Sequence, residues 1–322
     1  MYRLALLAPA LLILPAAAPV LAIAQASRPS FDIVLAGGRV LDPESGLDAV
    51  RNVGIRGGKV AAISARPLRG RQLVNVRGLV VSPGFIDLHT HEHDAESYGF
   101  YARDGVTTAL DGEGGAFPVA SWYAEREGKA RLNYGATVRH RRVRVAVIQG
   151  MEALRDPSTF RDPSAAYQHH RVTHEQLARV VSAVRQGLAE GAVGIGSILQ
   201  LTPGTTREEV LRLFELAAEH GVPYFVHPRF QGAVEPASGV AGVQEALAGA
   251  AVTGASLHLV HLPATLLRQT PLALDLVERA RRRGLDVTTE ASPYTASNVR
   301  LSSSVFNPGW QERLGIGYAD LQ

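Results

Sequence analysis

Between residues 173 and 290 the apolar positions repeat one pattern four times: a stripe at helical spacing, a glycine, and a short apolar run. The helical stripes end near Gly191, Gly221, Gly254 and Gly284. The apolar runs that follow cover residues 192–196, 223–227, 256–261 and 286–290. Helices that alternate with short buried strands are typical of a parallel sheet with helical crossovers. We therefore predict an α/β fold, with an eight-stranded β/α barrel first and an open doubly wound sheet as the alternative.

Two of these helices begin with a capping signal. Thr173 is followed three residues later by Gln176, and Thr206 by Glu209. In each pair, side chain and backbone can exchange hydrogen bonds, which predicts a capping box at each helix start.

The stretch from residue 31 to 81 has a different pattern, of short strands separated by turns. Phe31–Leu35 alternates, Ala36-Gly37-Gly38 predicts a turn, and Gly57-Gly58 predicts another. These glycines precede no helix start, which excludes a phosphate-binding loop. We predict a small β unit over residues 31–81 and the barrel over residues 82–322.

His89 and His91 lie in the apolar run Phe85–His91, directly after Pro83-Gly84. Side chains two positions apart on a strand point the same way, so both imidazoles should enter one volume. That is what two ligands of one metal ion require, although two are too few to hold zinc. Two ordinary strand histidines are the alternative interpretation.

Further ligating side chains end three more predicted strands: Asp111 and Glu113 after Gly105, His227, and His261. Chemistry in a β/α barrel gathers at the carboxyl ends of the strands, so these groups should meet at one rim. His258 is three positions from His261, so we expect it to face the opposite way and to be structural. His140 could line the mouth of the barrel.

Composition narrows the class of protein. The hydrophobic share of 46% and the charged share of 20% are ordinary for a globular protein. The net charge of +3 is too small, and the arginines too scattered, to predict a nucleic-acid partner. The sequence contains no cysteine, which excludes disulfides and thiolate metal ligands.

Residues 1–26 are predicted to be an export signal. Arg3 precedes an almost entirely apolar stretch, and Ala24-Gln25-Ala26 supplies a small-x-small cleavage pattern. Prolines within the stretch make it a poor membrane span. We expect an exported, periplasmic or secreted protein with no stable membrane span after cleavage, and an uncleaved N-terminal anchor is the alternative.

In these features the chain resembles the amidohydrolase superfamily, particularly its N-acyl-D-amino-acid deacylase (D-aminoacylase) branch. The likeness runs from about Ile33 to the last residue. It rests on residues 37–40, 83–91, 104–108, 227–229, 261–262 and 293–297. The resemblance implies a metal-dependent (β/α)8 barrel flanked by a β-sandwich built from both chain ends, of which residues 31–81 would be half.

Carried over position by position, the resemblance implies one or two Zn²⁺ ions bound by His89, His91, His227 and His261. The family adds a bridging ligand, which is a carboxylated lysine, a glutamate or a cysteine. We predict Glu113 for that role, because a carboxylate can span two ions. Asp111 is the second choice, and two solvated loop acids are a further alternative.

The resemblance also implies substrate-binding roles for Arg229, Tyr294 and Ser297. Arg229 could fork onto a substrate carboxylate, or equally form a structural salt bridge. Tyr294 and Ser297 match a segment near the substrate, although a turn packed over the rim would look the same. Many deacylases have a lysine where this chain has Pro263, so the usual substrate-carboxylate anchor is absent.

The implied function is hydrolysis of a linear, non-peptide amide bond in a small-molecule substrate, an N-acyl-D-amino acid, by metal-activated water. Cyclic-amide hydrolysis of the dihydroorotase or hydantoinase kind is the alternative, although neither Lys59 nor Lys129 ends a barrel strand to supply a carboxylated lysine.

The family takes a general acid/base aspartate from its eighth strand. The run at residues 286–294 looks like the seventh, and Asp320 follows no apolar strand. We expect a barrel of about seven strands that lacks the last one and is impaired in turnover. A non-catalytic metal-binding fragment is the third hypothesis.

Overall fold

The computed structural model describes residues 30–321 except positions 163, 293, 295, 297, 298, 300–303 and 307. The predicted export signal therefore lies outside the described residues. The chain divides into two compact units, Met1–Pro83 and Gly84–Gln322. Every helix in the described part is too short or too polar to cross a lipid bilayer.

The first unit is a five-stranded sheet. Its strands are β1 (Phe31–Asp42), β2 (Leu47–Arg56), β3 (Lys59–Ser64), β4 (Gly70–Asn75) and β5 (Val80–Val81). The order is β3-β2-β1-β4, and β5 also pairs with β1. Gly57 and Gly58 both have positive φ, which suits the tight hairpin turn between β2 and β3.

The turn predicted at Ala36-Gly37-Gly38 is wrong. Strand β1 runs through these residues, and its pairing with β2 shifts register between Leu35 and Gly38. Gly37 has a φ of 76°, so its left-handed conformation inserts a β-bulge that does not reverse the chain.

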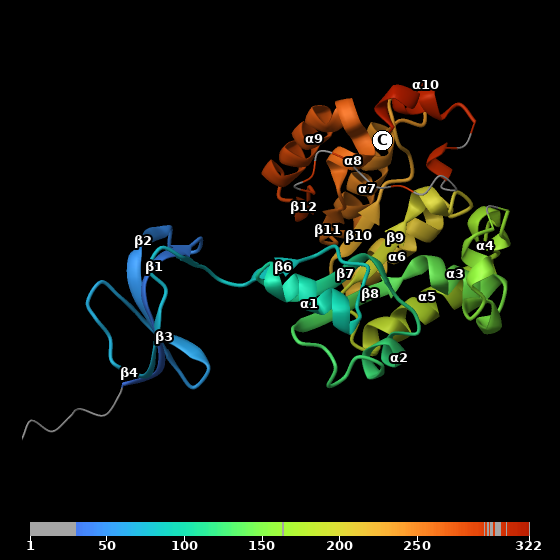
Figure 1. The fold of residues 1–322 in the computed structure, drawn as a ribbon. Helices are drawn as coiled ribbons and strands as arrows, with labels where there is room; N and C mark the ends of the chain where they lie inside the picture. Colours follow the sequence, from blue (N-terminus) through green and yellow to red (C-terminus); the bar gives the residue numbers. More distant parts are fainter. Residues whose placement is uncertain are drawn as a thin grey trace, which may run out of the picture. The chain divides into compact units, whose positions relative to one another are not determined.

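The second unit contains a seven-stranded parallel sheet in the order β12-β11-β10-β9-β8-β7-β6. Its strands are β6 (Phe85–Asp87), β7 (Val106–Ala116), β8 (Asn133–Arg139), β9 (Ile195–Ile198), β10 (Tyr224–His227), β11 (Leu257–Leu259) and β12 (Val287–Thr289). The strands follow one another in chain order, as the colours in Figure 1 show. A doubly wound sheet would reverse this order at a switch point, so the barrel-type winding is confirmed with seven strands.

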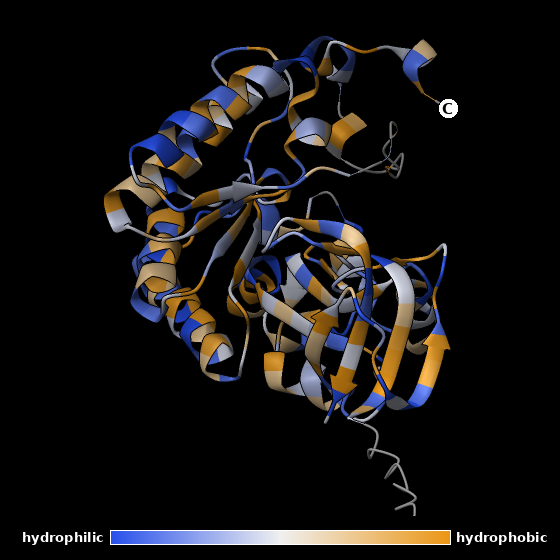
Figure 2. Ribbon diagram, turned by 90° about the vertical axis from the view of Figure 1, so that its left-hand side faces the viewer, coloured by the Kyte–Doolittle hydropathy of each residue, from blue (hydrophilic) through white to orange (hydrophobic). Residues whose placement is uncertain are grey.

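Helices cover the outer side of these strands, in the arc that Figure 2 shows. They are α5 (His174–Ala189), α6 (Arg207–His220), α7 (Gly239–Thr253) and α9 (Thr270–Arg282). The shorter helices are α1 (Ala95–Arg103), α2 (Val119–Ala124), α3 (His140–Ile148), α4 (Ala166–His169), α8 (Leu262–Leu266) and α10 (Trp310–Leu314). Side chains of the long helices pack with outward-facing strand residues such as Val138, Ile195 and Val226 in one core. All four predicted helices are confirmed, and α6 and α7 end at the left-handed glycines Gly221 and Gly254.

One of the two predicted capping boxes is incomplete. At α5 the exchange between Thr173 and Gln176 is present in both directions. At α6 the Thr206 hydroxyl accepts from the Glu209 amide, but the Glu209 side chain is fully buried and points away. Its carboxylate receives hydrogen bonds from Arg144 and lies 2.8 Å from His140 Nε2. His140 is therefore fully buried against Glu209 and does not line the mouth of the barrel.

Candidate metal centre

His89 and His91 lie beyond their strand. Strand β6 ends at Asp87, and the chain continues beside β7 through a bridge between His89 and Asp111. The amide of Thr90 donates to the carbonyl of Leu110 at 2.9 Å and holds this extension in place. The strand alternation used in the prediction therefore does not apply, yet the two Nε2 atoms lie 3.2 Å apart.

Glu113 is the centre of the cluster. Between Asp111 and Ala116, strand β7 departs from its register with β8, and Glu113 projects from this segment with only 5% of its surface exposed. Its Oε1 lies 2.7 Å from His227 Nδ1 and 2.9 Å from His261 Nε2. Its Oε2 lies 3.3 Å from the Nε2 atoms of both His89 and His91. One carboxylate thus joins four imidazoles that lie at or beyond the ends of three different strands.

These contacts form two groups that fit a metal ion. They are His89, His91 and Glu113, and Glu113, His227 and His261. In the first group the three ligand atoms are 3.2–3.3 Å apart. Ligand atoms around tetrahedral zinc, with bonds of about 2.0–2.1 Å, are separated by about 3.3 Å. In the second group, the buried Nε2 of His227 has no hydrogen-bond partner among the described residues.

Asp111 has a supporting position. Its Oδ1 accepts a hydrogen bond from the Gly114 amide at 2.9 Å and lies 3.2 Å from His91 Nδ1. The carboxylate therefore faces the ring nitrogen of His91 that points away from Glu113. A carboxylate in this place orients a ligand histidine and fixes its tautomer.

The charges in the cluster shift its pKa values in opposite directions. Burial opposes ionisation of Glu113, but its four imidazole neighbours outweigh burial and hold its pKa well below the usual value. Burial also opposes charging of His89, yet Glu113 and Glu290 raise its pKa to about 10. Asp111 and then Glu113 raise the pKa of His91 to about 9. Burial lowers the pKa of His227, which favours the neutral, ligating form.

The expected orientation of His258 is wrong. Strand β11 ends at Leu259, and His261 follows in a turn with a φ of 29°, so alternation does not relate the two histidines. Leu257 and Leu259 pack outward into the core, whereas His258 faces the barrel interior. There its Nδ1 lies 2.8 Å from Thr288 Oγ1 and its Nε2 3.3 Å from Glu290 Oε2.

Glu290 is a site residue that the sequence analysis missed. It follows β12 and contacts His89 Nδ1, and its Oε1 accepts a hydrogen bond from the His261 amide at 3.3 Å. Burial raises the pKa of this carboxyl, but His258 and His89 outweigh burial and lower it to about 2. The sequence contained a signal for this residue, because Glu290 ends the apolar run 286–290 just as Glu113 ends the predicted strand after Gly105.

The predicted substrate-binding residues are not gathered at this centre. The guanidinium of Arg229 donates to both carboxylate oxygens of Glu245, at 2.8 and 2.7 Å, and to the Thr205 carbonyl at 2.7 Å. Arg229 therefore forms a structural salt bridge, which was the predicted alternative to binding a substrate carboxylate. Tyr294 is 79% exposed, and Ser297 lies outside the described residues.

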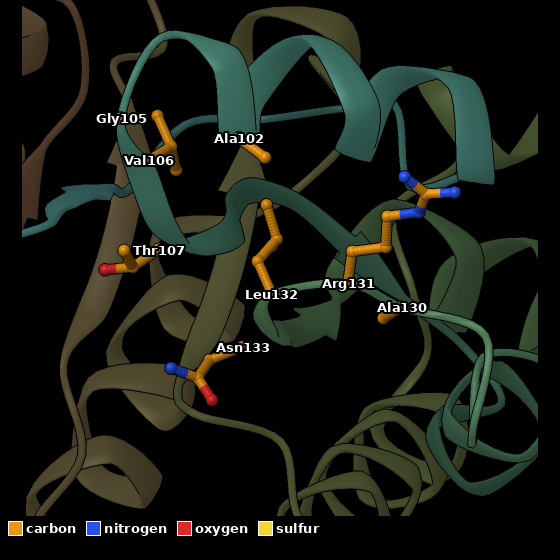
Figure 3. Close-up of a pocket in the computed structure, with 8 residues that line it drawn as sticks. All are labelled: Ala102, Gly105, Val106, Thr107, Ala130, Arg131, Leu132 and Asn133. Atoms are coloured by element: carbon orange, nitrogen blue, oxygen red, sulfur yellow. The ribbon is translucent and has the colours of Figure 1, made fainter. Parts of the chain in front are cut away.

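Two further features lie away from the cluster. Asp320 accepts a hydrogen bond from the Gly317 amide within a terminal turn. The hollow in Figure 3 is lined by residues such as Thr107 and Asn133, at the amino ends of β7 and β8. Glu113 is near the carboxyl end of β7, so this hollow is at the opposite end of the strands.

Gly196 of β9 has no side chain, which allows the backbone of the Glu113 segment to approach it closely. An added Cβ would lie 2.6 Å from the Glu113 carbonyl oxygen and 2.7 Å from that of Gly112. We expect Gly196→Ala to reduce the free energy of unfolding by about 1–3 kcal/mol, as overpacking does, and to weaken metal binding. Urea unfolding and metal titration measure the two effects.

Gly99→Ala is the control, because its Cβ would meet no atom within 4 Å. Within helix α1 this change should stabilise the chain by about 0.5–1 kcal/mol. If Gly196→Ala matched the parent in both measurements, the close approach of β9 to the Glu113 segment would be unimportant.

Metal affinity is expected to rise with pH from about 6 to about 9. Metal must displace the protons that His89 and His91 hold up to their pKa values of about 10 and 9. The apparent affinity should rise about tenfold per pH unit for each proton displaced. Competition with a chelator across this range measures the slope, and a slope of zero would contradict the raised pKa values.

In the metal-free protein, the same two histidines should make the free energy of unfolding decrease as pH rises, whereas metal affinity increases. Their pKa values are raised above 6.5 on folding, so their contribution is complete below pH 6.5 and is lost as pH rises through 9 to 10. Urea unfolding of metal-free protein on both sides of that range tests the sign.

Comparison with known proteins shows sequence relatives along most of the chain. N-acyl-D-glutamate deacylase of Alcaligenes xylosoxydans xylosoxydans is 31% identical over 309 residues, which cover 84% of this chain and 58% of that protein. D-aminoacylase of the same bacterium is 26% identical over 316 residues, covering 86% and 60%. Dihydroorotase of Anaeromyxobacter sp. strain K is 28% identical over 296 residues, covering 81% and 60%. No family model matches the chain.

Solved structures share the fold. A D-aminoacylase described as defining a novel subset of amidohydrolases superposes with a TM-score of 0.67 at 24% identity, covering 83% of this chain and 59% of that one. N-acyl-D-glutamate deacylase of Bordetella bronchiseptica, solved with zinc and a phosphonate inhibitor, has a TM-score of 0.66 at 24% identity, covering 82% and 59%. The chain spans 58–60% of the length of the curated relatives named above. The predicted resemblance is confirmed as a likeness: in sequence and in fold the chain is similar to N-acyl-D-glutamate deacylase and D-aminoacylase.

Proposed function

We propose that this chain supplies the metal centre of a hydrolase that cleaves a linear amide bond in an N-acyl-D-amino acid, with one or two Zn²⁺ ions as cofactor. The observation that carries the proposal is the position of Glu113, whose two oxygens each face two imidazoles at the carboxyl ends of barrel strands. The relatives support the class of substrate, since two are a D-aminoacylase and an N-acyl-D-glutamate deacylase.

Each ligand group has a role set by its contacts. Glu113 would be shared by both metal positions, with His89 and His91 on one side and His227 and His261 on the other. Asp111 orients His91 and Glu290 orients His89, each through the ring nitrogen that faces away from Glu113. A zinc ion bound there would activate water and polarise the amide carbonyl. The chain's own contribution is thus a preorganised ligand set with supporting carboxylates.

Hydrolysis of a linear amide is favoured over cyclic-amide hydrolysis by the position of the lysines. Lys59 begins strand β3 in the first unit, and the Lys129 ammonium donates to the Glu125 carbonyl at 2.9 Å. Neither residue ends a strand of the seven-stranded sheet, where the carboxylated lysine of the family would lie, and we propose Glu113 for the bridging position instead. The dihydroorotase relatives keep cyclic amides as the comparison substrate.

The test is hydrolysis of N-acetyl-D-leucine, N-acetyl-L-leucine and dihydroorotate by zinc-loaded protein, before and after chelation. We expect slow release of acetate from the D substrate, lost with chelator and restored by Zn²⁺. Preferred hydrolysis of dihydroorotate would replace the proposal by its alternative. Stoichiometric zinc binding with no hydrolysis of any substrate would support a non-catalytic metal-binding fragment.

We also propose that the protein is exported, on the strength of the apolar N-terminal stretch and its Ala24-Gln25-Ala26 pattern. The mature protein should begin after Ala26. N-terminal sequencing of the protein from the periplasm or medium tests this, and an intact Met1 would favour the uncleaved anchor.

A further inference from the structure

Four arginines lie in the segment 139–144, and three of them have acceptors. Arg141 donates to the Tyr167 hydroxyl, Arg142 to the Phe117 carbonyl and Arg144 to the Glu209 carboxylate. The side chain of Arg139 has no hydrogen bond or ion pair with any residue that the structure describes, and its Nε is buried without a partner. A buried guanidinium nitrogen without an acceptor is costly, so this one requires an explanation.

The position of Arg139 directs its side chain towards the metal centre. It ends strand β8 and pairs with Gly196 of β9. Its neighbour Val138 faces outward into the helix-packed core, so Arg139 faces the barrel interior. Thr137, on the same face, donates to the Gly112 carbonyl at 2.9 Å, directly beside Glu113.

The nearby carboxylates are already engaged. Asp111 and Glu113 are close enough to oppose the lowering of the Arg139 pKa by burial, but neither forms an ion pair with it. Glu113 faces four imidazoles, and Asp111 faces His91 and the Gly114 amide. Helix α3 begins at the next residue without a side-chain cap, which adds partial positive charge at the same place. The positive charge of Arg139 is therefore not paired with either of these carboxylates.

The other expected anchors for an anion are not available. Arg229 is paired with Glu245 in a bidentate contact. Pro263 stands in the first turn of α8 and has no charge. Of Arg139, Arg229 and Pro263, Arg139 alone carries a charge and has no acceptor among the described residues.

We propose that Arg139 binds a carboxylate of the substrate and so determines that the substrate is an acidic amide. The inference rests on the proposed function and names the residue that would bind the carboxylate of the substrate. A planar guanidinium presents paired donors that match a carboxylate, and each charge-assisted hydrogen bond adds affinity and orientation. On an N-acylated amino acid the group is either the α-carboxylate or a side-chain carboxylate, and both have the same chemistry.

Binding to zinc-loaded protein, measured by calorimetry, tests the proposal without requiring turnover. The probes are N-acetyl-D-leucine and its neutral carboxamide. N-acetyl-D-glutamine and N-acetyl-D-isoglutamine, which carry one carboxylate at opposite ends, distinguish the two sources. We expect Arg139→Met to weaken binding of N-acetyl-D-leucine about 10- to 100-fold and to leave the carboxamide within about twofold. Arg139→Lys should recover part of the loss.

Arg131→Met is the matched control, because Arg131 is exposed near the amino end of the same strand. It removes one charge at the opposite end of β8 and should leave binding of every probe unchanged. Zinc content and circular dichroism verify each variant, and Arg139→Lys serves as the test if Arg139→Met does not fold.

The outcomes separate this inference from the proposed function. Carboxylate binding that depends on Arg139, without hydrolysis of any probe, would support the proposed role of Arg139 and contradict the proposed hydrolase function. Equal loss of the acid and the carboxamide together with lost zinc would overturn the anchor, because Arg139 would then only support the Glu113 segment. Absence of any preference for the acid over the carboxamide in the parent protein would also overturn it.

Discussion

Glu113→Ala is expected to remove more than about 99% of the metal affinity at neutral pH. The reason is that Glu113 contributes to both ligand groups, so its loss leaves each with two imidazoles. Replacing a supporting residue around a metal typically costs 10- to 100-fold in affinity, and a shared ligand should cost more. Zinc content after dialysis and chelator competition give the measurement.

A second readout follows from the pKa values. Glu113 is one of the two carboxylates that raise the pKa of each of His89 and His91. Without it, both pKa values should fall towards 6.5, and imidazole titration by NMR can follow the change in metal-free protein. Glu113→Gln should show the same fall, since the amide keeps the size of the side chain and removes the charge.

Glu219→Ala is the control for Glu113→Ala. Glu219 is exposed on α6 and pairs with Arg185 at the surface. Its removal should leave metal content and imidazole titration unchanged. If instead Glu113→Ala kept its zinc while Asp111→Ala lost it, Asp111 would be the bridging ligand.

The second large effect is expected at the buried pair of Arg144 and Glu209. Both side chains have no exposed surface, and Arg144 also donates to the carbonyls of Tyr167 and His170. Arg144→Ala would leave the Glu209 carboxylate in the interior with His140 as its remaining partner. Breaking such a pair from one side costs about 3–5 kcal/mol of stability. Urea unfolding followed by circular dichroism measures the difference.

Two controls identify the cause of that loss. Arg185→Ala removes an arginine from a surface ion pair and should change stability by less than about 1 kcal/mol. Arg144→Met combined with Glu209→Leu removes both charges and should recover much of the loss, because no uncompensated carboxylate remains. A single variant as stable as the parent would mean that water reaches Glu209.

Local patterns predicted most of the second unit. A helix and the strand after it are specified by periodicity and by stop residues within about thirty residues of sequence. Gly221 and Gly254 show the reason, since each has the left-handed conformation that ends a helix and that glycine adopts most easily. The same reasoning failed at Gly37, where positive φ produced a bulge, because a glycine pattern alone does not distinguish a bulge from a reversal.

The candidate site was predictable as far as strand ends could be recognised. His227 ends a strand and contacts Glu113, as expected. His258 was misplaced because the strand is shorter than the apolar run, so alternation stopped before His261. Glu290 was overlooked although it obeys the same rule as Glu113.

By itself, the sequence determined the repeated helix and strand order and the imidazoles at the strand ends, because both follow from the spacing of nearby residues. Only the tertiary structure decided that Glu113 has the central position, that Arg229 pairs with Glu245 and that Arg139 has no acceptor among the described residues. These outcomes depend on which strand ends become neighbours and how their charges pair across long sequence separations. No local pattern contains that information, since parallel strands bring distant segments together only when the sheet forms.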